Sequence, residues 1–150
     1  MTAEETLRYM DSPEGLCAAR DCLSRALRKE AEIALDLARL DRLRRKRADR
    51  PALEEEIRRR ETAVTGGYRA LRVLREEIET VILRIPGETV RTVLRCHYLE
   101  GAPFFRIAMD LHYDERQIYR FQRQGLRHVA AQLACGLIRE EKNVRGLCGP

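Results

Sequence analysis

Apolar residues recur at helical spacing through most of the chain. Over residues 14–48 the recurring positions, separated by charged residues, are Leu16, Leu23, Leu27, Ile33, Leu37 and Leu40. Positions three, four or seven apart lie on one face of an α-helix, so this segment is predicted to be one long amphipathic helix. Ser12 and Pro13 suit its N-cap and first helical position. The residues before Ser12 are predicted to form a polar leader.

A second helix is predicted to begin at Pro51, which suits a first helical turn and disfavours helix in the residue before it. Its apolar positions form a seven-residue repeat, Ile57, Val64, Leu71, Ile78 and Ile85, with Leu53, Leu74 and Val81 at the complementary positions. This repeat is typical of a coiled coil. The short connection favours an antiparallel helical hairpin over residues 14–85, although the same stripes would also allow two copies to form a homodimer.

Two consecutive glycines, Gly66 and Gly67, lie in the middle of this second predicted helix. Together they should cost about 2 kcal/mol relative to alanines. We therefore expect a weak point or kink near them.

Pro86 and Gly87 end the arm, and a compact unit is predicted over residues 86–138. Residues 88–99 should form a helix that Gly101 stops, with an apolar surface made by Val90, Val93, Leu94, Cys96 and Tyr98. Residues 103–134 have the layout of a helix-turn-helix, with a core face of Ile107, Ala108 and Leu111 on the first helix and Asp114 as a carboxylate cap for the second. Residues 139–150 lack periodicity and are predicted to be a flexible tail.

The second helix of this motif carries four arginines at steps of four, three and four, within a stripe of about 60°. Its opposite face, predicted to be buried, contains Ile118, Phe121, Gly125 and Val129. The residues expected to bind DNA are Arg116, Gln117, Arg120, Arg123, Gln124 and Arg127. Arg and Gln side chains match guanine and adenine edges in the major groove. A solvated helix face in an arginine-rich chain is the alternative interpretation.

Position along this helix separates the expected roles. In helix-turn-helix proteins base contacts come mostly from the N-terminal part of the recognition helix. Arg116, Gln117 and Arg120 are therefore the candidates for reading bases. Arg123 and Arg127 lie further along the axis and are expected to hold phosphate.

Composition agrees with a helical protein that binds an anion. Charged residues make up 35% of the 150 residues, tryptophan is absent and the net charge is +5, so we expect an all-α fold and an anionic partner. A second basic run lies at residues 39–50. Its favoured interpretation is a solvated hairpin tip, with auxiliary phosphate contact as the other.

Several function classes are not expected. The five cysteines are odd in number and show no CxxC spacing, so a reduced, cytoplasmic protein is predicted. The three histidines share no ligand spacing, which argues against a metal site. No apolar run approaches the roughly 18 residues of a membrane span. Without a glycine-rich phosphate loop or a nucleophile-base pair, we expect no enzyme, cofactor or small-molecule substrate.

The residues of the predicted helix-turn-helix, with the helix before it, resemble a known DNA-binding motif. The stretch Val93-Leu94-Arg95-Cys96-His97-Tyr98-Leu99-Glu100-Gly101, followed by Arg106-Ile107-Ala108, Leu111-His112-Tyr113 and Gln117-Ile118-Tyr119-Arg120, resembles the DNA-binding region 4 of bacterial sigma factors. It is more similar still to phage-encoded late-transcription activators of the ArpU/RinA type and related prophage proteins. In this chain Pro103, Asp114 and Gly125 replace residues common in that family.

The resemblance covers residues 14–133 and implies a phage or prophage regulator of late genes that binds double-stranded DNA near promoters. Contact with RNA polymerase is a further implied role. A hypothesis of another class is a helical adaptor in phage assembly or DNA packaging, in which the helix-turn-helix serves protein assembly.

Overall fold

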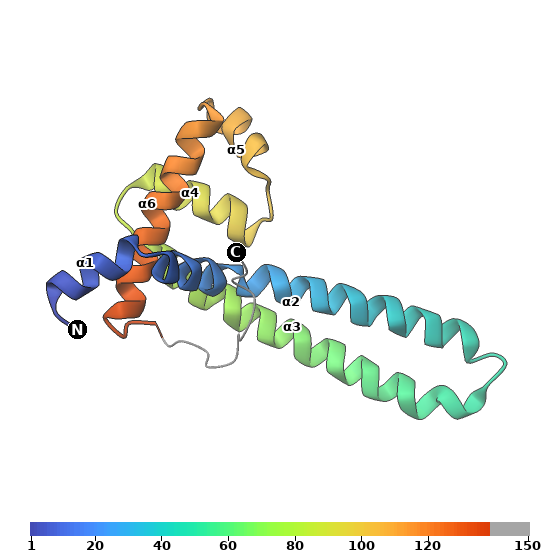
Figure 1. The fold of residues 1–150 in the computed structure, drawn as a ribbon. Helices are drawn as coiled ribbons and strands as arrows, with labels where there is room; N and C mark the ends of the chain where they lie inside the picture. The colour runs from blue at the N-terminus through green and yellow to red at the C-terminus, as the bar shows by residue number, and fades with distance from the viewer. Residues whose placement is uncertain (139–150) are drawn as a thin grey trace. The chain divides into compact units, whose positions relative to one another are not determined.

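The protein is all-helical, as its apolar pattern predicts. A computed structural model describes residues 1–138, and over this range it contains helices and no strand (Figure 1). The α-helices are α1 (Ala3–Asp11), α2 (Pro13–Lys46), α3 (Glu54–Leu83), α4 (Glu88–Leu94), α5 (Phe104–Leu111) and α6 (Glu115–Ala134). The predicted flexible tail, residues 139–150, lies outside the described residues.

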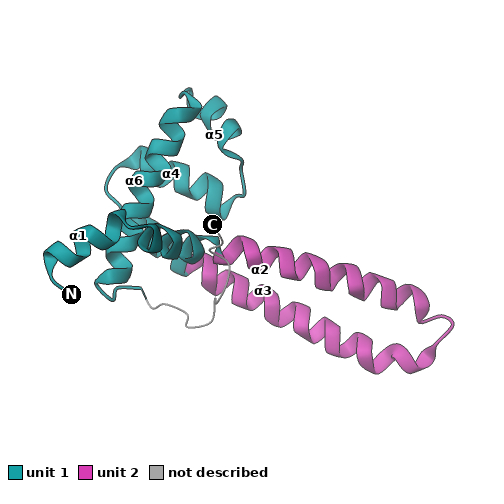
Figure 2. Ribbon diagram, in the orientation of Figure 1, with its two compact units in different colours: residues 1–24, 77–150 teal, residues 25–76 magenta. Residues whose placement is uncertain are grey.

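The chain divides into two compact units (Figure 2). Unit 1 contains residues 1–24 together with the chain from residue 77 onward, and unit 2 contains residues 25–76. These boundaries differ from the predicted arm at 14–85 and domain at 86–138. The reason is that Leu23 of α2 and Ile82 of α3 are fully buried in unit 1, so one end of each long helix belongs to the core of that unit.

The predicted polar leader is a helix, α1. Its capping box joins Thr2 and Glu5: the Thr2 Oγ1 accepts from the Glu5 N–H at 3.2 Å, and the Glu5 carboxylate accepts from the Thr2 N–H at 2.7 Å. No residue of α1 is buried, which is why the apolar pattern gave no sign of it. Ser12 then caps α2 through its Oγ, which accepts from the Gly15 N–H at 3.0 Å, as predicted.

In unit 2 the segments of α2 and α3 run antiparallel, side by side (Figure 2). Their apolar contact is made by the buried side chains of Ile33, Leu40, Ile57 and Val64. Ion pairs join the two helices along their edges, at 2.7 Å between Arg75 and Glu30 and at 2.9 Å between Arg44 and Glu61.

The two glycines of α3 do not interrupt it, since the helix is continuous from Glu54 to Leu83. They also have different surroundings. A Cβ on Gly67 would lie 3.1 Å from the Ile33 Cγ1, whereas a Cβ on Gly66 would meet nothing within 4 Å. Gly67 therefore lets α2 pass closely, and Gly66 faces open space.

Cysteine pairing differs from the prediction at one position. Cys17 is disulfide-bonded, so the expectation that every thiol is reduced is wrong there. Cys22, Cys96 and Cys135 form no disulfide. Within residues 1–138 no helix has the length and apolar character needed to cross a membrane, and no group of three or more His, Cys, Asp or Glu side chains is arranged to hold a metal ion.

Candidate nucleic-acid interface

The predicted helix over residues 88–99 is split in two. After α4 ends at Leu94, one π-helical turn covers Arg95–Leu99, in which the Glu100 N–H donates to the Arg95 carbonyl at 3.1 Å. Gly101 then ends the segment with a φ of +74°, a backbone conformation that favours glycine. The Arg95 Nε lies 2.6 Å from a carboxylate oxygen of Glu79, which fixes this turn against α3 within unit 1.

A small apolar core lies beneath α5 and α6. Val93, Ile107, Ala108 and Ile118 form its buried centre, and the partly buried side chains packed against it are Cys96, Ala102, Phe104, Leu111 and Phe121. This is the core face that the apolar spacing predicts. Because three helices contribute to it, the position of α6 is fixed by close packing rather than by the turn alone.

The turn between α5 and α6 has a defined backbone. His112 adopts a left-handed conformation with a φ of +59°, a position where glycine is more usual. The His112 N–H donates to the Met109 carbonyl at 3.4 Å and the Tyr113 N–H donates to the Ala108 carbonyl at 3.0 Å, which is the Schellman arrangement. The Tyr113 ring then packs edge-on against Phe121 of α6, with ring centroids 5.2 Å apart.

Asp114 occupies the N-cap position of α6, as predicted, but its carboxylate does not make the predicted cap. Its backbone is extended, and its carbonyl accepts from the Gln117 N–H at 2.9 Å and the Ile118 N–H at 3.2 Å. The side chain makes no hydrogen bond to the helix and is exposed. The helix start is therefore set by the backbone at Asp114.

Five of the six predicted site residues lie exposed on α6. They are Arg116, Gln117, Arg120, Arg123 and Gln124. Within residues 1–138 none of these five side chains forms an ion pair or a side-chain hydrogen bond. Their guanidinium and carboxamide groups are thus available to a ligand.

Arg127 differs from the other arginines of the stripe. Its Nε lies 2.6 Å from the Asp11 Oδ1, and its Nη2 donates to the Asp11 Oδ2 at 3.2 Å. α1 packs against α6, and Ala130, which the 100° periodicity puts beside the stripe, is fully buried. In the folded chain α1 thus engages the C-terminal part of the stripe, and the accessible part ends near Gln124.

Gly125 lies on the buried face of α6, as predicted, and the structure explains the residue type. A Cβ at this position would lie 2.5 Å from the Leu94 Cδ1 and 3.1 Å from the Val90 Cγ1. Both of these side chains are buried in α4. Glycine therefore allows α4 and α6 to cross closely.

Tyr119 is a surface residue of this site that the arginine pattern does not single out. Its ring is 49% exposed and packs at a tilt on Phe104, with centroids 4.9 Å apart, and Phe104 stacks on His97 at 3.9 Å. Tyr119 lies three residues after Arg116 and four before Arg123, so it borders the stripe. The three- and four-residue spacing from Arg116 and Arg123 is the feature of the sequence that places Tyr119 beside the stripe.

Not every glutamine of α6 belongs to the surface. Gln122 is buried and its Nε2 donates to the Tyr98 Oη at 3.0 Å, while the buried Gln132 donates to the Val81 carbonyl at 3.0 Å. Burial raises the pKa of Tyr98, which keeps its hydroxyl protonated. These two bonds hold α6 to the π-helical turn and to the end of α3.

The exposed stripe offers hydrogen-bond donors with fixed positive charge rather than groups that exchange protons. Guanidinium groups bind phosphate oxygens bidentately and also match the edge of guanine. Such an arrangement is suited to binding a polyanion. No family model matches this sequence, and comparison with curated proteins and with solved structures gives no significant match.

Proposed function

We propose that this protein is a sequence-specific, double-stranded-DNA-binding regulator of transcription. In this proposal α5, the turn at His112 and α6 act as a helix-turn-helix of the sigma-factor region 4 type, with α6 in the major groove. The observation that supports it is the set of unpaired polar side chains at the start of α6, Arg116, Gln117 and Arg120. They project from a helix that the fully buried Ile118 anchors to the core.

The roles of these residues follow from their order along α6. Arg116, Gln117 and Arg120 would contact base edges, and Arg123 and Gln124 would contact phosphate. The ion pair with Asp11 changes the role proposed for Arg127, because its guanidinium is already engaged in the folded chain. Arg127 would instead help to position α1, and would reach phosphate only when that pair opens.

The antiparallel α2 and α3 segments would form the hairpin arm of this regulator, serving dimerisation or contact with RNA polymerase. The source of this part of the proposal is the resemblance to phage and prophage late-gene activators. The proposed function assigns no catalytic role to any residue.

The test is fluorescence anisotropy with labelled duplexes from the DNA upstream of the gene cluster that encodes the protein, compared with scrambled duplexes of equal length. Arg116→Ala and Arg120→Ala should each reduce the preference for the cognate duplex about tenfold, since a bidentate base contact contributes about 1–3 kcal/mol of discrimination. Arg106→Ala is the matched control, because Arg106 is an exposed arginine on α5. Equal affinity of the wild type for both duplexes would refute sequence-specific reading.

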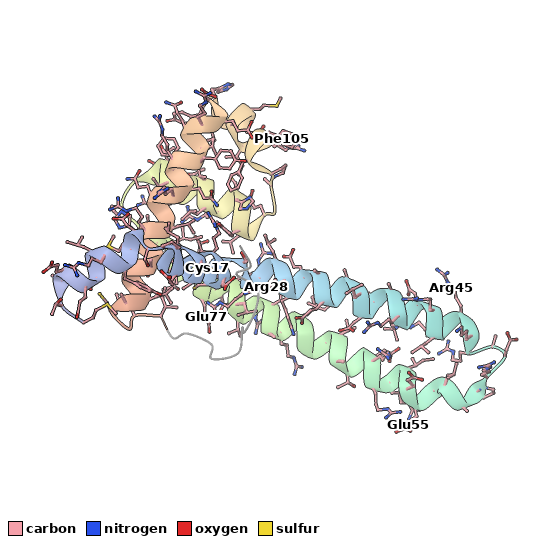
Figure 3. The ribbon with its side chains drawn as sticks, viewed as in Figure 1. Cys17, Arg28, Arg45, Glu55, Glu77 and Phe105 are labelled. Carbon is pink, nitrogen blue, oxygen red and sulfur yellow. The ribbon has the colours of Figure 1, made fainter. Side chains whose placement is uncertain are left out.

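A helical adaptor in phage assembly is a second candidate, favoured by one observation. Phe105 and Met109, four residues apart on α5, are 58% and 71% exposed. Figure 3 labels Phe105 on this helix. Exposed apolar side chains at helical spacing are typical of protein contact surfaces. Light scattering separates the candidates: an oligomer that Phe105→Ser dissociates, together with indifference to DNA, would favour the adaptor.

A further inference from the structure

The positive charge of the protein is distributed unevenly between its two units. The described residues of unit 1, 1–24 and 77–138, include 10 basic and 12 acidic residues. Unit 2 includes 16 basic and 10 acidic residues. The unit that carries α6 therefore has no positive excess, although the candidate interface lies on it.

Within unit 2 the excess is concentrated at one end. Residues 42–60, which we name the basic end, include 9 basic and 4 acidic residues. They comprise the last turn of α2, the connecting turn and the start of α3. Figure 3 labels two side chains of the basic end, Arg45 and Glu55. Its charge excess of +5 equals the net charge of the whole chain, which is also +5.

Few of these cations are neutralised. Among the nine, Arg44 pairs with Glu61 at 2.9 Å, Arg47 with Glu54 at 3.4 Å and Arg60 with Glu56 at 3.6 Å. The other six are exposed and have no acidic partner within residues 1–138: Arg42, Arg45, Lys46, Arg50, Arg58 and Arg59. Three uncompensated charges thus lie on α2, two on α3, and one, Arg50, in the connection between them.

Helix stability explains only part of this cluster. Cations in the last turn of a helix interact favourably with its dipole, which accounts for Arg45 and Lys46. The dipole effect does not extend to Arg50, which lies beyond α2, and it does not favour cations at Arg58 and Arg59 near the N-terminal end of α3. Their accumulation at one end fits a polyanionic ligand.

The side chains of the basic end favour phosphate over an apolar or lipid partner. Eight of its nine cations are arginines, whose planar groups match phosphate oxygens bidentately. No large apolar side chain of residues 42–60 is exposed, and Leu43 and Leu53 are half-buried. Insertion into a membrane or docking on an apolar protein groove would require such side chains.

We propose that the basic end of unit 2 is a second contact surface for duplex DNA, which binds the phosphate backbone without reading sequence. The proposal rests on the proposed function only in taking duplex DNA as the polyanion. It assigns to unit 2 an additional share of the sequence-independent affinity and leaves sequence preference to α6. The two surfaces have no residue in common, so mutations can separate their contributions to DNA affinity.

The experiment measures anisotropy of the full-length protein with a random-sequence duplex across a range of salt concentrations. The variant Arg45→Gln/Lys46→Gln removes two unpaired cations of the basic end. Its matched control, Arg69→Gln/Arg72→Gln, removes two exposed arginines from the middle of α3, in the same unit but away from the basic end. Circular dichroism checks that both variants remain helical.

The expected result is a smaller salt dependence for the Arg45→Gln/Lys46→Gln variant. The slope of log K against log salt should fall in magnitude by about 1.8, because each phosphate contact contributes about 0.9. The control variant should keep the wild-type slope. Identical slopes for the two variants would overturn the proposal, and so would a loss of binding to anionic vesicles or polyglutamate with unchanged binding to DNA.

This readout is independent of the one that tests the proposed function. If the wild type shows no sequence preference but the slope still falls, α6 does not read bases and the basic end still binds DNA. If preference is present and the slope is unchanged, the basic end is a solvated surface and the inference fails.

Discussion

The two units of this protein bury their helices in different ways. Unit 1 crosses several helices over a shared core, and the crossing of α4 and α6 requires the bare backbone of Gly125. Unit 2 packs two antiparallel helices along one apolar seam, at whose end cations accumulate. Reading a sequence needs side chains held in fixed positions, whereas attraction to phosphate needs only charge. Unit 1 therefore provides the fixed side-chain positions that the proposed reading of bases requires, and unit 2 provides the charge.

Glycine substitutions allow the two units to be compared by measurement, because each unit contains glycine in the interior of a helix. Gly125 is enclosed by Leu94 and Val90, while Gly66 faces open space. The same substitution should therefore have opposite effects in the two units.

The largest expected effect is that of Gly125→Ala. The new methyl group would lie 2.5 Å from the Leu94 Cδ1. Overpacking of this kind costs about 1–3 kcal/mol, which exceeds the gain in helix propensity of about 1 kcal/mol. Urea denaturation should show a lower free energy of unfolding for this variant.

Gly66→Ala is the matched substitution in unit 2. It should raise the stability of α3 by about 0.5–1 kcal/mol, because alanine favours helix and meets no neighbour. A destabilised Gly66→Ala, or an unchanged Gly125→Ala, would contradict the packing described for the two units.

A smaller effect concerns Asp11, which ties α1 to α6. Asp11→Asn removes the charge that engages Arg127 and should increase affinity for random-sequence DNA about two- to fivefold, the range expected for one exposed ion pair of up to about 1 kcal/mol. Glu14→Gln removes an equal charge from an exposed residue of α2 and is the control. Equal gains in both variants would mean that only net charge matters.

The smallest expected effect is a pH dependence within unit 1. Burial, and secondarily the charge of Arg127, lower the pKa of His128 below its ordinary value of 6.5. The unfolded chain then binds a proton more readily than the folded one, so stability should fall as pH drops below about 6.5 and level off below the folded-state pKa. His128→Gln should weaken this dependence in thermal denaturation from pH 7 to pH 5; the same slope in both proteins would assign it to other groups.

Local sequence patterns predict where the helices lie better than they predict the contacts that each side chain makes. The apolar spacing of Ile107 and Ile118 correctly predicted buried faces, and Ser12 correctly predicted a helix start. α1 was missed because none of its residues is buried, and the carboxylate cap at Asp114 was predicted from residue type alone. The residue type limits which contacts a side chain can make, and the neighbouring residues in the fold determine which of these contacts form.

At the candidate site, local sequence is enough to predict the helix, its buried face and the stripe of arginines, because all three follow from 3.6-residue periodicity. The folded chain shows that Asp11, a residue 116 positions away, engages Arg127, and that Gln122 is buried against Tyr98. It also shows that Gly125 is needed for the crossing of α6 with α4. These contacts join segments distant in the chain, and no local periodicity contains them.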